Sequence, residues 1–364
     1  MTDLDFAGEV TNYGVHGIYS YPARFIPQIP RFFIEKYKPK VVLDPFGGSG
    51  TTAVEAKLHG ALPVHVDIMP VSFALARVKC HEFTTIEFHR ALVALRLALK
   101  APERKLPMEW MDKELTCHGK DGDYRYFKDN VLEEIMAVRE AILAMDDCPA
   151  KDFARLCAGQ CLQRVASAMI QASHWEEGHV VREDYIDVFL KYMATMRDKF
   201  EAYYRQHPGF LNGIHPVILN SQLGTFSWVL GSDKRAAELK DSIDLIVTSP
   251  PYGKLVRVVN YPEIHKFTHL FFFEEPSPPP SAFIQSTAGL NQYMDRWCSF
   301  LRPGGHCVVV VAPSCSDDWV TETRAMLARS GLEKCEDVER VIDPTRKYAP
   351  RQITREWVLD WMKK

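Results

Sequence analysis

The sequence lacks a long hydrophobic run. Its longest apolar stretches, such as HCVVVVAP at 306–313, are far shorter than the roughly 20 residues that a membrane-spanning helix needs. The first ten residues, MTDLDFAGEV, have neither the basic nor the apolar region of a signal peptide. We therefore expect a cytoplasmic protein with no membrane partner.

Paired cysteines are also absent. The nine cysteines include no Cys-x-x-Cys pair and follow no regular spacing, so the sequence predicts neither a disulfide framework nor a metal site. Cys157 and Cys161 would share one face of a helix, and we interpret them as small buried side chains.

The chain has little excess charge of either sign. Its net charge is −3, so binding to a polyanion would have to come from a local basic face. With 364 residues, 46% of them hydrophobic, the chain is long enough for one large domain that carries an insertion.

Strand and helix patterns alternate in the first part of the chain. The runs KVVLD at 40–44 and ALPVHVD at 61–67 predict strands, and each is followed by a segment with helical spacing. Strand patterns return with HPVILN, DLIVTS and GHCVVVVAP, and the final segments GLEKCEDVERVI and REWVLDWMKK resemble an antiparallel pair. We predict an α/β fold, a Rossmann-like doubly wound sheet with a C-terminal antiparallel hairpin.

The middle of the chain has a different pattern. From about residue 85 to 207 almost every periodic segment has helical spacing, including the stretch DFARLCAGQCLQRVASAMIQA at 152–172. We therefore predict a helical insertion at 81–215, within an α/β domain made of residues 1–80 and 216–364.

A glycine-rich turn follows the first predicted strand, in VLDPFGGSGTT at 42–52. Such a turn between a parallel strand and a helix is typical of a nucleotide-like ligand site, because Gly47, Gly48 and Gly50 let a ligand lie against the main chain. A P-loop is excluded because no Lys follows the last glycine. Asp44 and Phe46 disfavour a bound pyrophosphate.

An acidic residue at the end of the strand favours a cationic ligand such as S-adenosylmethionine. Asp67 ends the second predicted strand, where it can accept hydrogen bonds from ribose hydroxyls, and Ile68 beside it can stack on adenine. A tight helix-packing turn without a ligand is the alternative interpretation of the glycines.

A second unusual turn follows a later strand, in DLIVTSPPYG at 244–253. The two prolines hold the backbone rigid and direct carbonyl groups away from the sheet ladder. Ser249 and the carbonyl of Pro250 can accept hydrogen bonds from an amino group, and Tyr252 offers a face for a planar base. Accepting both amine protons aims the nitrogen lone pair at a methyl sulfonium, so this chemistry needs positioning and no covalent intermediate.

Together, DPFGGSGTT and TSPPYG resemble the S-adenosylmethionine-dependent amino-methyltransferases of DNA, in particular the Ser-Pro-Pro-Tyr type associated with cytosine N4. HGIYSYPARFIPQIPRFFIEKY at 16–37 resembles the segment that precedes the first strand in that family. The resemblance covers roughly residues 1–80 and 216–364. It implies the non-permuted motif order, in which the insertion at 81–215 is a possible target-recognition region.

The resemblance also implies roles for individual residues. The target base would be held by Ser249, Pro250, Pro251 and Tyr252. The cofactor site would be lined by Tyr21, Arg24, Phe25, Asp44, Phe46, Gly48, Gly50, Thr51, Asp67 and Ile68. The sequence departs from the family after the third strand, where VILNSQ has Asn220 and Ser221 in place of an acidic residue.

The resemblance implies a DNA methyltransferase that acts on the N4 amino group of a cytosine flipped out of the duplex, with a cognate restriction enzyme as a possible partner. Adenine N6 is the nearest alternative, and RNA, a protein glutamine or a non-catalytic reader are more distant ones. Methylation at cytosine C5 is excluded, because Ser314 separates Pro313 from Cys315 where a Pro-Cys nucleophile would be needed.

Two basic clusters are candidates for phosphate contacts. One follows the Ser-Pro-Pro-Tyr turn, with Lys254, Arg257 and Lys266; the other, at 340–355, includes Arg340, Arg346, Lys347, Arg351 and Arg355. Ordinary solvated charge explains either cluster equally well. We interpret His265 as a surface or packing residue and not as a catalytic base.

Overall fold

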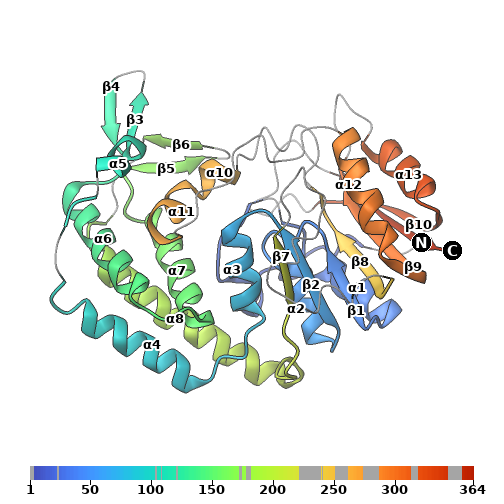
Figure 1. Cartoon of the computed structure of the whole chain (residues 1–364), viewed down its shortest axis with the longest axis horizontal. Helices are drawn as coiled ribbons and strands as arrows, with labels where there is room; N and C mark the ends of the chain where they lie inside the picture. The colour runs from blue at the N-terminus through green and yellow to red at the C-terminus, as the bar shows by residue number, and fades with distance from the viewer. Residues whose placement is uncertain are drawn as a thin grey trace.

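The computed structural model describes most of the chain (Figure 1). The described residues are 4–22, 24–102, 105–107, 109–119, 122–171, 174–177, 182–220, 239, 241–250, 261–273, 287–312, 319–342 and 355–364.

A mixed sheet of seven strands forms one half of the described structure. Its order is β10-β11-β9-β8-β1-β2-β7, and β11 lies antiparallel to both of its neighbours while the other pairs are parallel. The strands are β1 (Val41–Asp44), β2 (Leu62–Asp67), β7 (Val217–Asn220), β8 (Ile243–Thr248), β9 (Leu301–Val311), β10 (Leu332–Val341) and β11 (Arg355–Lys363). The predicted α/β fold and its C-terminal antiparallel hairpin are confirmed.

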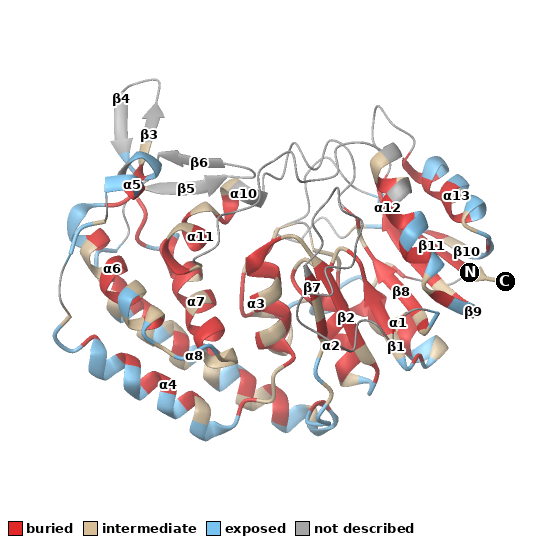
Figure 2. Ribbon diagram, in the orientation of Figure 1, coloured by how far each residue is buried: buried red, intermediate tan, exposed pale blue. Residues whose placement is uncertain are grey.

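Helices cover both faces of this sheet. Along β1, Val42 packs with the helices α1 (Gln28–Tyr37) and α2 (Thr51–Leu58), whereas Leu43 packs with α12 (Thr287–Ser299) and α13 (Trp319–Arg329). Successive side chains of a strand point to opposite faces, so apolar residues at both positions bury the strand completely. Figure 2 shows the central strands almost entirely buried.

The sheet has a topological switch point between β1 and β8. From β1 the chain proceeds outward through β2 to β7, and from β8 it proceeds in the opposite direction to β9. In doubly wound sheets, ligands bind at the carboxyl ends of the strands on either side of such a point. The residues at these ends are Asp44 on β1 and Thr248 on β8.

The insertion forms a second, helical core beside the sheet, on the left in Figure 1. Phe83, Phe88, Phe153 and Phe200 make a cluster of ring contacts in its interior. Its helices are α4 (Thr85–Ala98), α5 (Glu109–Asp112), α6 (Asp129–Leu143), α7 (Pro149–Leu162) and α8 (Tyr185–Gln206), and α3 (Pro70–Lys79) joins it to the sheet. Short 3₁₀ turns cover Gly14–Gly17, Lys113–Leu115 and Pro208–Phe210.

The insertion also contains strands, and the helical prediction was wrong at the end of the 152–172 segment. Residues Thr116–Gly119 and Gly122–Arg125 form a hairpin, β3–β4, and residues Ala168–Gln171 and His174–Glu177 form another, β5–β6. The pattern at 152–172 suggested one helix, yet α7 ends at Leu162, whose carbonyl accepts from the N–H groups of Val165 and Ala166 in a closing turn. Local apolar spacing does not distinguish a helix end from a short strand.

Part of the C-terminal half also belongs to the helical core. Helices α10 (Tyr261–Ile264) and α11 (Lys266–Phe272) follow the Ser-Pro-Pro-Tyr turn in the chain, and α11 packs against α6 and α7. Phe267 is fully buried there, in ring contact with Tyr126 and Phe127. The helical core is therefore not confined to residues 81–215.

Within the part of the chain that the structure describes, no helix has both the length and the hydropathy needed to cross a membrane.

Gly50 and Gly60 form a matched pair for testing the turn before α2. Both have positive φ, at +75° and +78°, but a Cβ at Gly50 would lie 3.3 Å from the Ala76 Cα, whereas a Cβ at Gly60 meets nothing within 4 Å. We expect Gly60→Ala to lower the free energy of unfolding by about 1 kcal/mol from strain alone, and Gly50→Ala to lower it further. Urea unfolding measures both losses. Equal losses would show that crowding against α3 does not constrain the turn.

Candidate active site

The carboxylate of Asp44 joins the two unusual turns. Its Oδ1 accepts a hydrogen bond from the Thr248 hydroxyl at 2.7 Å, and its Oδ2 accepts one from the Thr52 hydroxyl at 2.8 Å. Thr52 lies in the first turn of the helix after the glycine-rich turn, and Thr248 directly precedes Ser249. The two motifs, about two hundred residues apart in sequence, thus meet at the switch point of the sheet.

Burial governs the charge of Asp44, which is only 2% exposed. Loss of solvent raises the pKa of this carboxyl to about 6, although hydrogen bonds from Thr248, Thr52 and the Phe46 N–H act in the opposite direction. The side chain is therefore ionised at neutral pH but close to its titration range. A cation placed beside it would favour the ionised form.

The glycines of the turn have identifiable packing reasons. A Cβ at Gly47 would lie 2.2 Å from the imidazole of buried His65, and the Gly47 N–H donates to the Val66 carbonyl at 2.8 Å. Gly48 has a φ of +48°, and a Cβ there would lie 3.3 Å from the Tyr21 ring. The turn is thus held tightly against β2 and against the N-terminal segment.

Asp67 fixes the same turn from the end of β2. Its Oδ2 accepts from the Gly48 N–H at 2.7 Å, and its Oδ1 accepts from the N–H groups of Ile68 and Met69 at 2.7 and 2.9 Å. Burial raises the pKa of this carboxyl, and the three backbone donors oppose that change. A bound ribose would share a carboxylate that already has protein partners.

The other predicted cofactor residues near this turn differ in burial and in contacts. Tyr21 is buried beside Gly48, Ile68 is half-buried, and Phe46 is half-buried with its ring 5.1 Å from that of Tyr293. Thr51 is buried, with its hydroxyl 2.9 Å from that of Ser49.

Two residues of the N-terminal segment have contacts away from the turn. Arg24 donates to the His16 carbonyl at 2.6 Å and to the Asn12 side chain, and Phe25 packs with the cluster around α1.

The predicted base-binding residues are described only in part. Ser249 is half-buried and Pro250 is buried. Pro251 and Tyr252 lie outside the described residues, as do Lys254, Arg257, Arg346, Lys347, Arg351 and the side chain of Asn220.

The predicted phosphate-binding role of Arg340 does not agree with its environment. This side chain is only 2% exposed and forms a buried ion pair with Glu356 on the neighbouring strand β11. Lys266 and Arg355 also have acidic partners, Glu114 at 2.9 Å and Glu339 at 3.4 Å. Arg340 is a structural residue of the C-terminal hairpin.

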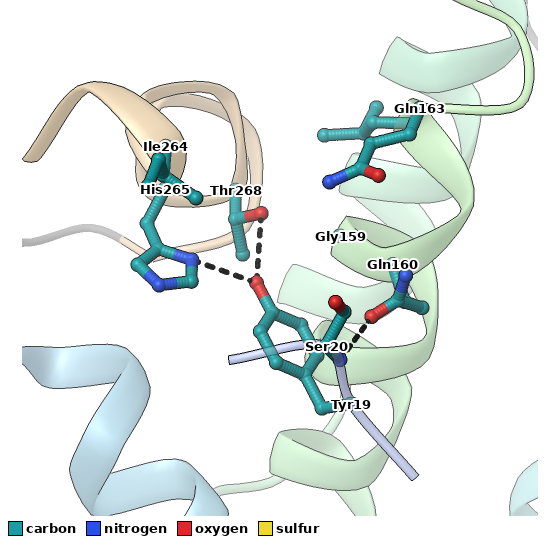
Figure 3. A pocket seen from close by; sticks show the side chains of 9 residues that line it. Tyr19, Ser20, Gly159, Gln160, Gln163, Ile264, His265 and Thr268 are labelled. Atoms are coloured by element: carbon teal, nitrogen blue, oxygen red, sulfur yellow. Dashed lines mark hydrogen bonds between the residues drawn. The ribbon is translucent and has the colours of Figure 1, made fainter. Parts of the chain in front are cut away.

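His265 connects the helical core to the N-terminal segment (Figure 3). Its Nδ1 lies 3.1 Å from the Tyr19 hydroxyl, and its ring stacks on Tyr21 with centroids 5.1 Å apart. The Tyr19 hydroxyl also lies 3.3 Å from the Thr268 hydroxyl, and the Ser20 N–H donates to the Gln160 side chain at 2.6 Å. His265 is 1% exposed, so packing, the second of our two interpretations, is correct.

Because Tyr21 contacts both His265 and Gly48, a continuous packed path runs from the helical core to the glycine-rich turn. Sequence reasoning missed Tyr19, Gln160 and Thr268 in this path.

In the part of the chain that the structure describes, one group of possible metal ligands lies elsewhere. His306, Cys335 and Asp360 come from the three C-terminal strands, and their ligand atoms lie within 4.8 Å of one another. Asp360 already pairs with His306 at 3.0 Å and with Lys36 at 3.2 Å, and it accepts from the Tyr37 hydroxyl. These contacts explain the group as a hydrogen-bond network that anchors α1 on the sheet.

Comparison with known proteins finds relatives among methyltransferases. The chain is 25% identical over 288 residues to the Type II methyltransferase M.MvaI of Kocuria varians. This alignment covers 73% of this chain and 59% of that protein. It is 30% identical over 103 residues to the Type II methyltransferase M.MjaII of Methanocaldococcus jannaschii, covering 28% of this chain and 19% of the relative. The chain therefore spans less than two thirds of the length of either relative. No family model matches it.

Similarity to solved structures is low. The rRNA methyltransferase aviRa from Streptomyces viridochromogenes aligns over 99% of this chain and 93% of its own, with 12% identity and a TM-score of 0.34. A DNA modification methylase from Thermus thermophilus aligns over 36% of this chain and 52% of its own, with 18% identity and a TM-score of 0.22. The resemblance to methyltransferases indicated by the two motifs is confirmed by the sequence relatives.

Acid should destabilise the packed path through His265. Burial lowers the pKa of this imidazole to about 3, so between about pH 6.5 and pH 3 the unfolded chain binds a proton that the folded chain does not. Stability is complete above about pH 6.5 and is lost as the pH falls, by up to about 1.4 kcal/mol per pH unit. We expect His265→Gln to be less stable than wild type at neutral pH and the difference to shrink in acid.

Urea unfolding at neutral and mildly acidic pH measures this difference. His89→Gln, on the exposed side of α4, controls for the loss of a surface histidine. A His265→Gln deficit that is the same at both pH values would contradict the buried, neutral state of His265.

Proposed function

We propose that this protein is an S-adenosylmethionine-dependent DNA methyltransferase that methylates the exocyclic N4 amino group of a cytosine. The observation that carries this proposal is the contact between Asp44 and Thr248 at 2.7 Å. It brings the start of the glycine-rich turn and the start of the Ser-Pro-Pro-Tyr turn to one edge of the sheet. A transfer between two ligands, each held by one turn, requires this proximity.

The described residues fit S-adenosylmethionine chemically. Gly48 has no side chain, so only main chain lies at that position beside the ends of β1 and β2. Asp67 supplies acceptor atoms there. Asp44 supplies a negative charge suited to a cationic amino-acid end. When bound, the cofactor provides a methyl group on a sulfonium. Gly50, Thr51, Phe46 and Ile68 complete the proposed site, with Tyr21 behind the turn and Arg24 and Phe25 further along the N-terminal segment.

The second turn acts on the acceptor. An exocyclic amine conjugated to a base is a weak nucleophile because its lone pair is delocalised. The Ser249 hydroxyl and the Pro250 carbonyl would accept its two protons and orient the lone pair, while Tyr252 would stack on the ring. Pro251 would keep the turn rigid. The base must leave the duplex to reach these groups.

The identity of the base rests on one residue. Ser at the first position of the tetrapeptide favours cytosine N4, whereas Asp there is typical of adenine N6. Both bases present an exocyclic amine, so N6-adenine methylation is the second candidate. We further propose the helical insertion as the target-recognition region and a restriction enzyme as a possible partner. RNA, a protein glutamine side chain or a purely binding role are the remaining candidates.

Methyl transfer from labelled S-adenosylmethionine to separate DNA, RNA and protein acceptors tests the proposal. We expect label in duplex DNA, and digestion to nucleosides should place it in N4-methylcytosine. Ser249→Ala should lower turnover at least tenfold through loss of one proton acceptor, about 1.4 kcal/mol in the barrier, with cofactor affinity nearly unchanged.

Label in N6-methyladenine would favour the second candidate. Label only in RNA or protein, or none in any acceptor, would exclude a DNA methyltransferase. A Ser249→Ala protein with wild-type turnover would remove Ser249 from the catalytic turn.

A further inference from the structure

A basic groove lies on helix α8 (Tyr185–Gln206). It has a volume of about 390 Å³, with an apolar floor made by Val188 and Met196. Its walls carry the cations Arg164, Arg182, Lys191 and Lys199, together with Tyr192 and Thr195. Positions 188, 191, 192, 195, 196 and 199 follow helical spacing, so they form one continuous face of α8.

Most of this positive charge has no acidic partner among the residues that the structure describes. Among the described residues, Arg182 forms an ion pair with Asp184, but no carboxylate lies within ion-pair distance of Arg164, Lys191 or Lys199. All three side chains are exposed. The groove therefore concentrates cations in a chain whose net charge is −3, which is the local basic face that binding to a polyanion requires.

The groove is held rigidly and is linked to the candidate active site. The Arg164 guanidinium lies over the Tyr192 ring, 5.0 Å from its centroid, and the Tyr192 hydroxyl donates to the Ile18 carbonyl at 2.9 Å. Ile18 begins the short segment that leads to Tyr21, the residue packed against Gly48. One wall of the groove is thus fixed to the segment that supports the glycine-rich turn.

We propose that this groove binds the sugar-phosphate backbone of the nucleic acid substrate. Lys191 and Lys199 lie eight residues apart, or about 12 Å along the helix axis, a length comparable to three or four base pairs of a duplex. Exposed lysines along such a groove contact phosphates without reading bases, so the groove anchors the substrate and leaves sequence recognition to other residues. The inference rests on the proposed function, because it assigns a contact surface to the same substrate.

Salt dependence of DNA binding tests the groove directly. Each phosphate contact contributes about 0.9 to the slope of log affinity against log salt concentration for duplex DNA. We expect the double variant Lys191→Gln, Lys199→Gln to lower that slope by about 1 to 2, and to weaken binding about equally for different sequences. Fluorescence anisotropy with a labelled duplex at several salt concentrations provides the measurement.

A matched control removes the same charge elsewhere. Lys40 directly precedes β1, at the end of that strand opposite to Asp44, and Lys100 follows α4. Both lysines are exposed. The double variant Lys40→Gln, Lys100→Gln should keep the wild-type slope. An equal decrease in slope in the two double variants would mean that the effect comes from net charge alone. That result would contradict the groove proposal.

The test separates the groove from the proposed function. If the wild-type protein binds and methylates DNA and the groove variant keeps the wild-type slope, the groove proposal fails alone. If the wild-type protein binds no DNA, both proposals fail. Unchanged affinity of the groove variant for S-adenosylmethionine would show that a lower slope does not come from misfolding.

Discussion

One buried carboxylate holds the candidate site together. Asp44 receives hydrogen bonds from Thr248 and Thr52, so it ties the end of β8 and the start of α2 to the end of β1. Without these bonds the side-chain link between the two turns would be lost. The parallel register of β1 with β8 supports the same geometry from inside the sheet. The proposed chemistry depends on a fixed distance between the turns, because catalysis by positioning tolerates little displacement.

The glycine-rich turn shows how packing and function share the same residues. At position 47 a side chain would collide with the imidazole of His65. At position 48 the positive φ and the nearby Tyr21 ring favour glycine. A turn built this way is preformed, and Asp67 holds it through the hydrogen bond from the Gly48 N–H, while the N–H groups of Ile68 and Met69 fix the carboxylate itself. Preorganisation of this kind reduces the entropy lost on binding. The support extends through Tyr21 and His265 to the helical core, so two parts of the molecule contribute to one site.

Sequence patterns predicted the sheet well because buried parallel strands give short β-branched runs between glycine turns and helices. They also singled out Asp44, Gly48 and Ser249 as site residues, because their residue types are unusual for their positions, and these roles stay predictions. They failed where tertiary contacts decide the outcome. The segment after Leu162 has helical apolar spacing but forms a strand, Arg340 has the charge of a phosphate ligand but is buried against Glu356, and α11 belongs to a core formed by helices far earlier in the chain. No local pattern contains that information.

The pH dependence of S-adenosylmethionine affinity tests the central role of Asp44 most directly. Burial raises the pKa of its carboxyl to about 6, so the side chain is mainly neutral below that pH and ionised above it. Calorimetric titration of the wild-type protein should show affinity rising as the pH increases through about 6, by at most about tenfold per pH unit. The Asp44→Asn variant lacks the titrating carboxyl, whereas any titration of the cofactor itself affects it as it affects the wild type. This variant should bind S-adenosylmethionine weakly, and its affinity should not rise with pH. An equal rise in both proteins, or none in the wild type, would contradict the account.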